Sequence, residues 1–260
     1  MTNHLILVTG ATGSIGRLAV EEAVREGHRV RMLTRRSGQK ALPNGAEVVL
    51  GDLTRPDTLT AAVAGVDAVI FAHGTYGSVR NAELVDYGGV RNILLALGDQ
   101  RAHLALMTAI AVTDRKGAHD WKRRAERLIR ASDMSYTIVR PGWFDYNDAD
   151  QLMPVLLQGD RRQSGTPRDG VIARRQVARI LVKSLFCPSA DRKTFELVAE
   201  KGLEPQSLDT LFAGVDADIS GAVDAVHDAT NMPLSDEPQT VLDEFRQIEG
   251  RRRARAGSVA

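Results

Sequence analysis

The chain has 260 residues, 43% of them hydrophobic and 26% charged, with a formal net charge of +1. This composition is ordinary for a globular protein, and the balanced charge argues against a nucleic-acid partner, which needs a clustered basic field. No apolar stretch approaches the ~20 residues of a membrane-spanning helix, and Leu5–Val8 is too short for the core of a secretory signal. The one cysteine, Cys187, has no partner for an internal disulfide, so we expect a cytoplasmic protein.

Short apolar runs alternate with helical patterns over the first 140 residues. The runs predicted as buried strands are Leu5–Thr9, Arg29–Leu33, Glu47–Leu50, Ala68–Ala72, His103–Thr108 and Tyr136–Val139. The helical patterns between them are Ser14–Glu26, Pro56–Ala64, Val79–Leu97 and Ala118–Ser132. This alternation predicts a doubly wound α/β fold of the Rossmann type, with a parallel sheet and helices on both faces.

The pattern loosens after Pro141. A helix is predicted at Arg174–Leu185, a strand at Thr194–Val198 and a last helix from Ser235. The apolar face of that last helix comprises Val241, Leu242, Phe245 and Ile248. We therefore expect a Rossmann domain at residues 1–202 and a C-terminal extension at residues 203–260. The extension ends in a basic tail, Arg251–Arg255, which is either a solvated end or an arm for a phosphate or a partner.

A glycine-rich turn follows the first predicted strand and opens a helix. Gly10 allows a sharp exit from the strand, Gly13 lets the backbone approach a pyrophosphate, and Gly16 lets the helix pack closely on the sheet. The free N–H groups and the positive dipole end of the helix attract the anion. The predicted phosphate contacts are Gly10, Thr12, Gly13, Ser14, Ile15 and Gly16. The alternative is a glycine-rich turn without a ligand.

The end of the second strand indicates which dinucleotide binds. An acid there would bind the ribose 2′-hydroxyl of NAD, whereas arginine suits the 2′-phosphate of NADP. The chain has Arg35 and Arg36 at this point and no acid, with Lys40 close by in sequence. Two guanidinium groups suit a bidentate phosphate contact, so we predict NADP as the cofactor, with NADPH preferred over NADH. The alternative is two solvated arginines on a loop.

Four further motifs extend the pattern over roughly residues 5–200. They are Gly51-Asp52-Leu53, Val85-Asp86-Tyr87-x-Gly89-x-x-Asn92, Tyr136-Thr137-Ile138-Val139-Arg140-Pro141-Gly142 and Ile172-x-Arg174-x-x-Val177-Ala178. With the glycine turn, these motifs resemble the atypical short-chain dehydrogenases/reductases, in particular the NmrA-like and biliverdin-IXβ (flavin) reductase-like NAD(P)H-binding proteins. The further cofactor contacts that this resemblance implies are Asp52 and Leu53 beside the adenine, Ala72, His73 and Gly74 along the cofactor, and Pro141 and Gly142 beside the nicotinamide. Whether His73 is reactive or a hydrogen-bonded loop histidine stays open.

The proton relay of the wider family is incomplete in this chain. That relay has a tyrosine four residues before a lysine, which lowers the tyrosine pKa, and a serine or threonine after the fifth strand. Lys122 and Thr108 match the lysine and the hydroxyl, but Ala118 stands in place of the tyrosine. Lys122 is therefore predicted as a ribose ligand, with a surface lysine as the alternative. The candidates for a replacement proton donor are Asp86, Tyr87, Tyr76 and His119.

These features predict an NADPH-dependent oxidoreductase acting on a small molecule. A conjugated acceptor such as a flavin, quinone or enone suits a site without the tyrosine, because its charge is delocalised. Substrate is expected beneath the loops at residues 143–175, where Trp143 and Phe144 either line the pocket or pack in the core. The alternative function is a non-catalytic NADP(H)-binding redox sensor that acts through a protein partner. We expect no metal site, and a homo-oligomer is compatible with the sequence.

Overall fold

One large sheet organises the chain. A computed structural model describes residues 3–37 and 43–257, with side chains up to Gly250. Eight strands of these residues form the sheet, in the order β3-β2-β1-β4-β5-β6-β10-β8. Their bounds are β1 Leu5–Thr9, β2 Arg29–Thr34, β3 Ala46–Leu50, β4 Ala68–Phe71, β5 His103–Met107, β6 Tyr136–Pro141, β8 Met153–Leu157 and β10 Lys193–Glu200. Neighbouring strands are parallel except β8, which runs antiparallel to β10.

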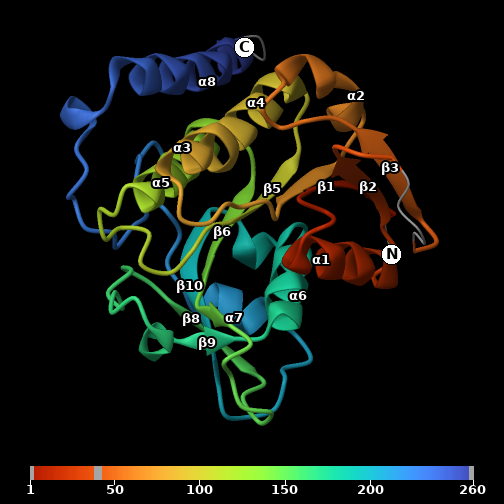
Figure 1. The fold of residues 1–260 in the computed structure, drawn as a ribbon, viewed down its shortest axis with the longest axis vertical. Coiled ribbons are helices and arrows are strands. Elements are labelled where there is room, and N and C mark those ends of the chain that lie inside the picture. The colour runs from red at the N-terminus through yellow and green to blue at the C-terminus, as the bar shows by residue number, and fades with distance from the viewer. Residues whose placement is uncertain (1–2, 38–42, 258–260) are drawn as a thin grey trace.

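Helices cover both faces of this sheet (Figure 1). On one face lie α1 (Ser14–Arg25), α6 (Arg174–Ser184) and the short α7 (Asp209–Ala213). On the other lie α2 (Thr60–Val63), α3 (Val79–Asn81), α4 (Gly88–Leu97), α5 (Ala118–Ala131) and α8 (Gln239–Gly257). Each face has its own apolar core, so the predicted doubly wound α/β fold is confirmed. Within the described ranges, no helix is long and apolar enough to cross a bilayer.

Three predicted helices differ clearly from the structure. The pattern at Pro56–Ala64 is a 3-10 helix at Pro56–Thr58 followed by the short α2. The helix expected at Val79–Leu97 contains a π-helical segment, Ala82–Tyr87, between α3 and α4, and there the amide of Gly88 donates to the carbonyl of Glu83. The last helix begins at Gln239 rather than Ser235. Its delayed start has a local cause, because Glu237 precedes a proline and is extended, with ψ 144°.

Several elements escaped prediction because they are short or lie at an edge. The strand β8 contains Pro154, which pairs opposite Ala199 at the sheet edge, a position where a missing N–H is tolerated. The strands β7 (Trp143–Phe144) and β9 (Val171–Ile172) form a separate two-stranded sheet. This small sheet holds the loops of residues 143–175 beside the carboxyl end of β6.

The extension after Gly202 packs onto the same sheet as the rest of the chain. Phe212 of α7 is fully buried in the core beneath α1 and α6. Val241 and Ile248 of α8 are buried, and Ile248 joins the core on the opposite face, beside α4 and α5. The extension therefore contributes side chains to both apolar cores.

Buried charges connect α5 to the extension. Arg127 Nη2 lies 2.8 Å from Asp224 Oδ2, and its Nη1 lies 2.7 Å from Glu237 Oε1. Deeper in the molecule, the fully buried Arg140 of β6 donates to both oxygens of Asp228, at 2.7 and 2.6 Å. Burial by itself raises the pKa of Asp228, but the hydrogen bonds and charge of Arg140 outweigh it and lower that pKa. The extension is thus held by charge pairs as well as by apolar contacts.

We expect Arg140→Ala to destabilise the protein by about 3–5 kcal/mol, because it leaves buried carboxylates without their partner. Urea unfolding followed by circular dichroism measures this loss. The matched control is Arg246→Ala, which removes an exposed arginine that pairs with Asp243 on α8, and it should change the free energy of unfolding by less than ~1 kcal/mol. Equal small effects of both substitutions would contradict the structural importance of the Arg140 cluster.

Candidate functional site

The glycine turn after β1 lies directly against the end of β4. Gly10 has φ +68°, and a Cβ atom there would lie 2.7 Å from backbone atoms of His73. In the strand order, β1 separates β2 and β3 from β4, β5 and β6, so this is the point where the order reverses. Ligands of open α/β sheets bind outside the carboxyl ends of the strands at this point.

Gly13 and Gly16 have different surroundings within the turn. Gly13 is the N-cap of α1, with φ −77°, and a Cβ atom there would meet only the Gly10 carbonyl oxygen, at 3.1 Å. A Cβ atom at Gly16 would lie 2.1 Å from that same oxygen. Gly16 is therefore required by the turn itself, rather than by packing of the helix on the sheet as predicted. The open side of Gly13 fits a bound phosphate.

The adenine-side residues follow β2 and β3. Arg35 and Arg36 are exposed after β2, and Lys40 lies outside the described residues. Hydrogen bonds from Thr54 are the largest cause of the lowered pKa of Asp52, and the charge of Arg35 adds to it. The charge effect indicates that Arg35 and Asp52 lie near one another at this edge. Two exposed guanidinium groups have the geometry that suits a phosphate.

Asn92 of α4, a residue of the predicted motif, binds the segment after β3 that contains Asp52 and Leu53. Its Nδ2 donates to the carbonyl of Leu53 at 2.7 Å, and the Leu53 side chain packs against the core. A Cβ atom at Gly89 would lie 2.8 Å from His73 Nε2 and 3.3 Å from Leu53 Cβ. The glycine thus allows α4 to approach both predicted cofactor contacts.

His73 has a hydrogen-bond partner within the fold. Its Nδ1 lies 2.7 Å from Thr9 Oγ1. Burial is the main cause that lowers the pKa of His73 to about 4, against an opposing effect of the Asp86 charge. The ring is therefore neutral at physiological pH. It pairs with Thr9 of β1, next to the buried Ala72 that follows β4.

Asp86 and Lys122 form an ion pair next to Gly74. Lys122 Nζ lies 2.9 Å from Asp86 Oδ2, and a Cβ atom at Gly74 would lie 3.8 Å from both groups. The Asp86 carboxylate also accepts hydrogen bonds from the amide and the hydroxyl of Thr75, both at 2.8 Å. The structure thus brings together three of the predicted residues: Gly74 on the loop after β4, Asp86 on the π-helical segment and Lys122 on α5. The carboxylate of Asp86 accepts three hydrogen bonds there.

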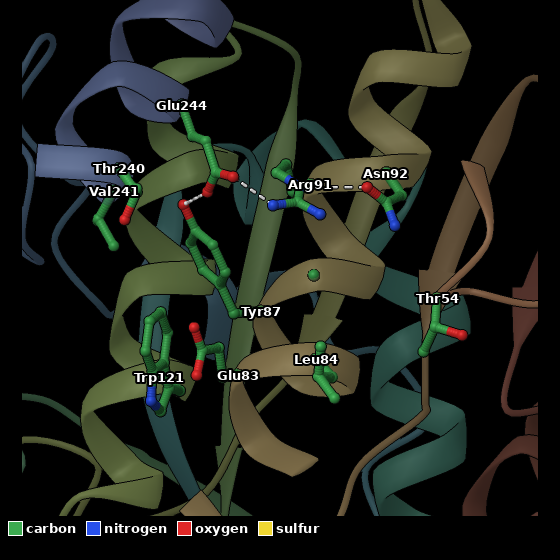
Figure 2. A pocket seen from close by; sticks show the side chains of 11 residues that line it. Thr54, Glu83, Leu84, Tyr87, Arg91, Asn92, Trp121, Thr240, Val241 and Glu244 are labelled. Carbon is green, nitrogen blue, oxygen red and sulfur yellow. Dashed lines mark hydrogen bonds and ion pairs between the residues drawn. The ribbon is translucent and has the colours of Figure 1, made fainter. Parts of the chain in front are cut away.

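Two predicted hydroxyls point away from this pair. Thr108 is buried and donates at 2.8 Å to Glu126, which also accepts hydrogen bonds from Arg140. Tyr87 donates to Glu244 of α8 at 2.6 Å, and burial raises its pKa. Figure 2 shows the Tyr87 hydroxyl and Arg91 both directed at the Glu244 carboxylate. Neither hydroxyl lies beside Lys122.

The other candidate proton donors also lie elsewhere. Tyr76 is 94% exposed on the loop after β4. His119 Nδ1 lies 2.9 Å from Asp114 Oδ1 and 3.0 Å from the carbonyl oxygen of Ala111. Of the four candidates from the sequence, only Asp86 contacts Lys122.

A cavity of about 270 Å³ lies between α8 and the helices beneath it (Figure 2). Its lining residues are Thr54, Glu83, Leu84, Tyr87, Gly88, Arg91, Asn92, Trp121, Thr240, Val241 and Glu244. They include neither Asp86 nor Lys122. This cavity is therefore distinct from the crevice at the ends of the strands.

Two residues expected beside a nicotinamide lie at the carboxyl end of β6. Pro141 and Gly142 are buried, and a Cβ atom at Gly142 would lie 2.5 Å from the carbonyl oxygen of Gly170. The glycine lets the chain pass directly into β7, where Trp143 and Phe144 are half-buried. Phe144 packs against the core, and Trp143 lies edge-to-face with Tyr146.

A family model described as NAD(P)H-binding matches residues 10–188, more than half of the chain. The chain belongs to this NAD(P)H-binding family. The match includes the glycine turn, the Asp86–Lys122 pair and the start of α6. It confirms the NAD(P)H-binding domain and the nicotinamide cofactor that the resemblance to the atypical short-chain dehydrogenases/reductases implied.

Individual relatives are distant. Photosystem II assembly factor Ycf39 of Synechocystis is 28% identical over 205 residues, which cover 75% of this chain and 63% of that protein. The chain thus spans less than two thirds of this relative. Sanguinarine reductase of Eschscholzia californica is 26% identical over 241 residues, covering 74% of this chain and 88% of the relative.

A solved structure shows the same fold. ChuY, described as an anaerobillin reductase of Escherichia coli O157:H7, superposes with a TM-score of 0.57 and 20% identity, over 77% of this chain and 99% of that one. At this identity the similarity is one of fold.

Sequence reasoning missed a second cavity, beside the phosphate turn of this NAD(P)H-binding chain. This cavity is wide open to solvent. It measures about 470 Å³ and is lined by Ser14, Arg17, Leu18, Asp145, Ala173, Arg174 and Arg175. The signal for it in the sequence is the motif Ile172-x-Arg174-x-x-Val177-Ala178, which contains Arg174. Asp145 lies in an irregular loop, and only the tertiary structure brings it to the start of α6.

We expect Gly13→Val to abolish nucleotide binding while the protein stays folded. The backbone at Gly13 is in a region open to valine, with ψ 172°, but the branched side chain would occupy the space over the turn. Cofactor fluorescence titration and circular dichroism measure the two properties. Gly16→Val is the contrasting variant, and it should disrupt the fold because its Cβ atom would clash with Gly10. Nucleotide binding by folded Gly13→Val would remove the phosphate-turn assignment.

Proposed function

We propose that the protein is an NADPH-dependent reductase that transfers a hydride to a conjugated small molecule such as a flavin, quinone or enone. The observation that carries this proposal is the environment of Lys122. Its only acidic partner, Asp86, is already engaged by Thr75. Within the described part of the chain, no tyrosine hydroxyl contacts Lys122.

The chemistry of the acceptor follows from this arrangement. The bound cofactor supplies a hydride. A simple ketone would become an alkoxide-like oxygen, whose stabilisation needs a donor within ~3 Å. Asp86 in its ionised form accepts hydrogen bonds and donates none, and Thr108 and Tyr87 donate elsewhere, so we assign no proton transfer to these two hydroxyls. A conjugated acceptor spreads the charge and takes its proton from solvent.

The residues of the chain supply binding and orientation in this proposal. The cradle at Gly13, which any side chain would fill, fits the pyrophosphate, with Gly10, Thr12, Ser14 and Ile15 around it. Arg35 and Arg36 bind the 2′-phosphate. Asp52 and Leu53 flank the adenine. Lys122 binds the ribose, and His73 and Gly74 lie along the cofactor. Pro141 and Gly142 flank the nicotinamide. Asp86 holds Lys122 in place and keeps the charge of the pair neutral.

Two similar proteins support the reductase class, since their names are sanguinarine reductase and anaerobillin reductase. The relative Ycf39 is named as an assembly factor, and it favours a second candidate, an NADP(H)-binding regulator that acts through a protein partner. Tight NADPH binding without turnover of any acceptor would select the regulator. A cytoplasmic location and a homo-oligomer remain part of the proposal.

We expect NADPH to bind at least tenfold more tightly than NADH, because Arg35 and Arg36 pair with the 2′-phosphate. A tenfold ratio corresponds to ~1.4 kcal/mol, within the range of charge-assisted hydrogen bonds. Fluorescence titration of both cofactors against the wild type and the double variant Arg35→Ala/Arg36→Ala tests this. The double variant should lose the preference while it keeps its NADH affinity. If the double variant still prefers NADPH over NADH, the two arginines do not bind the 2′-phosphate.

We expect NADPH oxidation with flavins, quinones or enones and poor turnover of unactivated ketones. Lys122→Ala should raise KM for NADPH more than it lowers kcat, as expected for a group that binds the ground and transition states alike. Lys201→Ala is the matched control, because that lysine is exposed and pairs with Asp150. Fast turnover of a simple ketone would mean that the site contains a proton donor, and it would overturn the assignment.

A further inference from the structure

Arg174 joins the phosphate turn to the loop that follows β7. Its Nε lies 3.2 Å from Ser14 Oγ, at the start of α1. Its guanidinium forms an ion pair with Asp145 and lies 5.1 Å from the ring centroid of Phe144. One side chain at the first position of α6 thus contacts both the predicted cofactor turn and the predicted substrate side.

Asp145, in the loop after β7, binds the start of α6. Its Oδ1 accepts a hydrogen bond from the amide of Arg174 at 3.0 Å, and its own amide donates to the carbonyl of Ile172 at 2.9 Å. Its φ of +59° is in the left-handed region, which is uncommon for residues other than glycine although aspartate adopts it more readily than most. The loop is held in this conformation by contacts that include the Arg174 ion pair.

The charge around Arg174 favours an anion. The cavity of about 470 Å³ beside the turn is lined by Arg17, Arg174 and Arg175 and by one acid, Asp145. Arg17 pairs with Glu21 outside the cavity lining. Arg175 has no ion-pair partner among the described residues. Positive charge therefore remains uncompensated within reach of Ser14.

We propose that Arg174 binds the pyrophosphate of the nucleotide and, in doing so, leaves Asp145. This inference rests on the nucleotide site of the proposed function and adds a regulatory step to it. The Arg174–Asp145 pair is partly exposed, with 36% and 49% of the two side chains accessible, and such pairs are weak. A pyrophosphate at the turn offers more negative charge and a geometry suited to the planar guanidinium.

The exchange of partner transmits nucleotide occupancy to the substrate side. Once Arg174 turns to the phosphate, Asp145 loses the charge that helps to hold its left-handed conformation. Trp143 and Tyr146, whose rings lie 6.1 Å apart on this loop, then change their surroundings. Nucleotide binding is therefore coupled to the state of the loop on the substrate side.

Two ligands separate a pyrophosphate contact from a general effect on the site. NADP+ contains the pyrophosphate, whereas adenosine 2′-monophosphate lacks it. We expect Arg174→Ala to raise the Kd for NADP+ about tenfold, equivalent to ~1.4 kcal/mol, and to leave the Kd for adenosine 2′-monophosphate unchanged. Arg174→Lys, which keeps the charge, should recover most of this loss. Arg29→Ala is the control, because Arg29 is exposed at the opposite end of β2.

Trp143 reports the loop directly. The chain has two tryptophans, so Trp121→Phe leaves Trp143 as the only one. In this background NADP+ should change the Trp143 emission, and Arg174→Ala should abolish the change even at saturating NADP+. Asp145→Asn, which keeps an acceptor for the Arg174 amide, should move the nucleotide-free emission toward that of the bound protein.

The outcomes distinguish this inference from the proposed function. A wild type that binds neither NADP+ nor NAD+ would overturn the nucleotide site as a whole. If the wild type binds and Arg174→Ala has the same Kd, or loses both ligands equally, the Arg174 inference is wrong while the nucleotide site stands. A wild type that prefers NAD+ would be tested with NAD+ and adenosine in the same way.

Discussion

The buried guanidinium of Arg140 is the contact on which the arrangement of the site depends. It donates to Glu126 of α5 and to Asp228 of the extension, so one cation joins β6, α5 and the C-terminal segment. Glu126 also accepts the hydroxyl of Thr108 after β5. Removing Arg140 takes away the ion-pair partner of the buried Asp228 carboxylate, which is far more unfavourable than the loss of an exposed pair. Because Lys122 lies one turn before Glu126 on α5, the position of its ammonium group follows from this cluster.

Local patterns were sufficient to predict most of the fold. The glycine turn, the apolar strands and the amphipathic helices each depend on neighbours within a few residues, and they occur where the sequence indicated. The exceptions have local causes as well. Pro154 is untypical of a strand, so β8 was not predicted, and Pro238 keeps Glu237 extended, so the last helix begins after it. The π-helical segment Ala82–Tyr87 has no comparable signature, because its periodicity differs from that of an α-helix by less than one residue per turn.

The directions of the functional side chains were harder to predict. Asp86 and Tyr87 are adjacent in sequence, yet one pairs with Lys122 and the other with Glu244, 157 residues away. Thr108 matched a family position, but its hydroxyl is taken by Glu126. Such outcomes depend on partners supplied by distant parts of the chain, and the extension that supplies Glu244 and Asp228 lies outside the motifs from which the site was predicted.

The position of α8 limits how two copies of the chain can associate. This helix lies over α4 and α5 and is held there by Glu244, which binds Tyr87 and Arg91, and by Ile248 in the core. A helix-to-helix dimer through α4 and α5 would have to expel α8, break the contacts of Glu244 and expose the buried Tyr87 and Ile248. A symmetric assembly must therefore use another surface, such as the outer face of α8 or the opposite layer that contains α1 and α6.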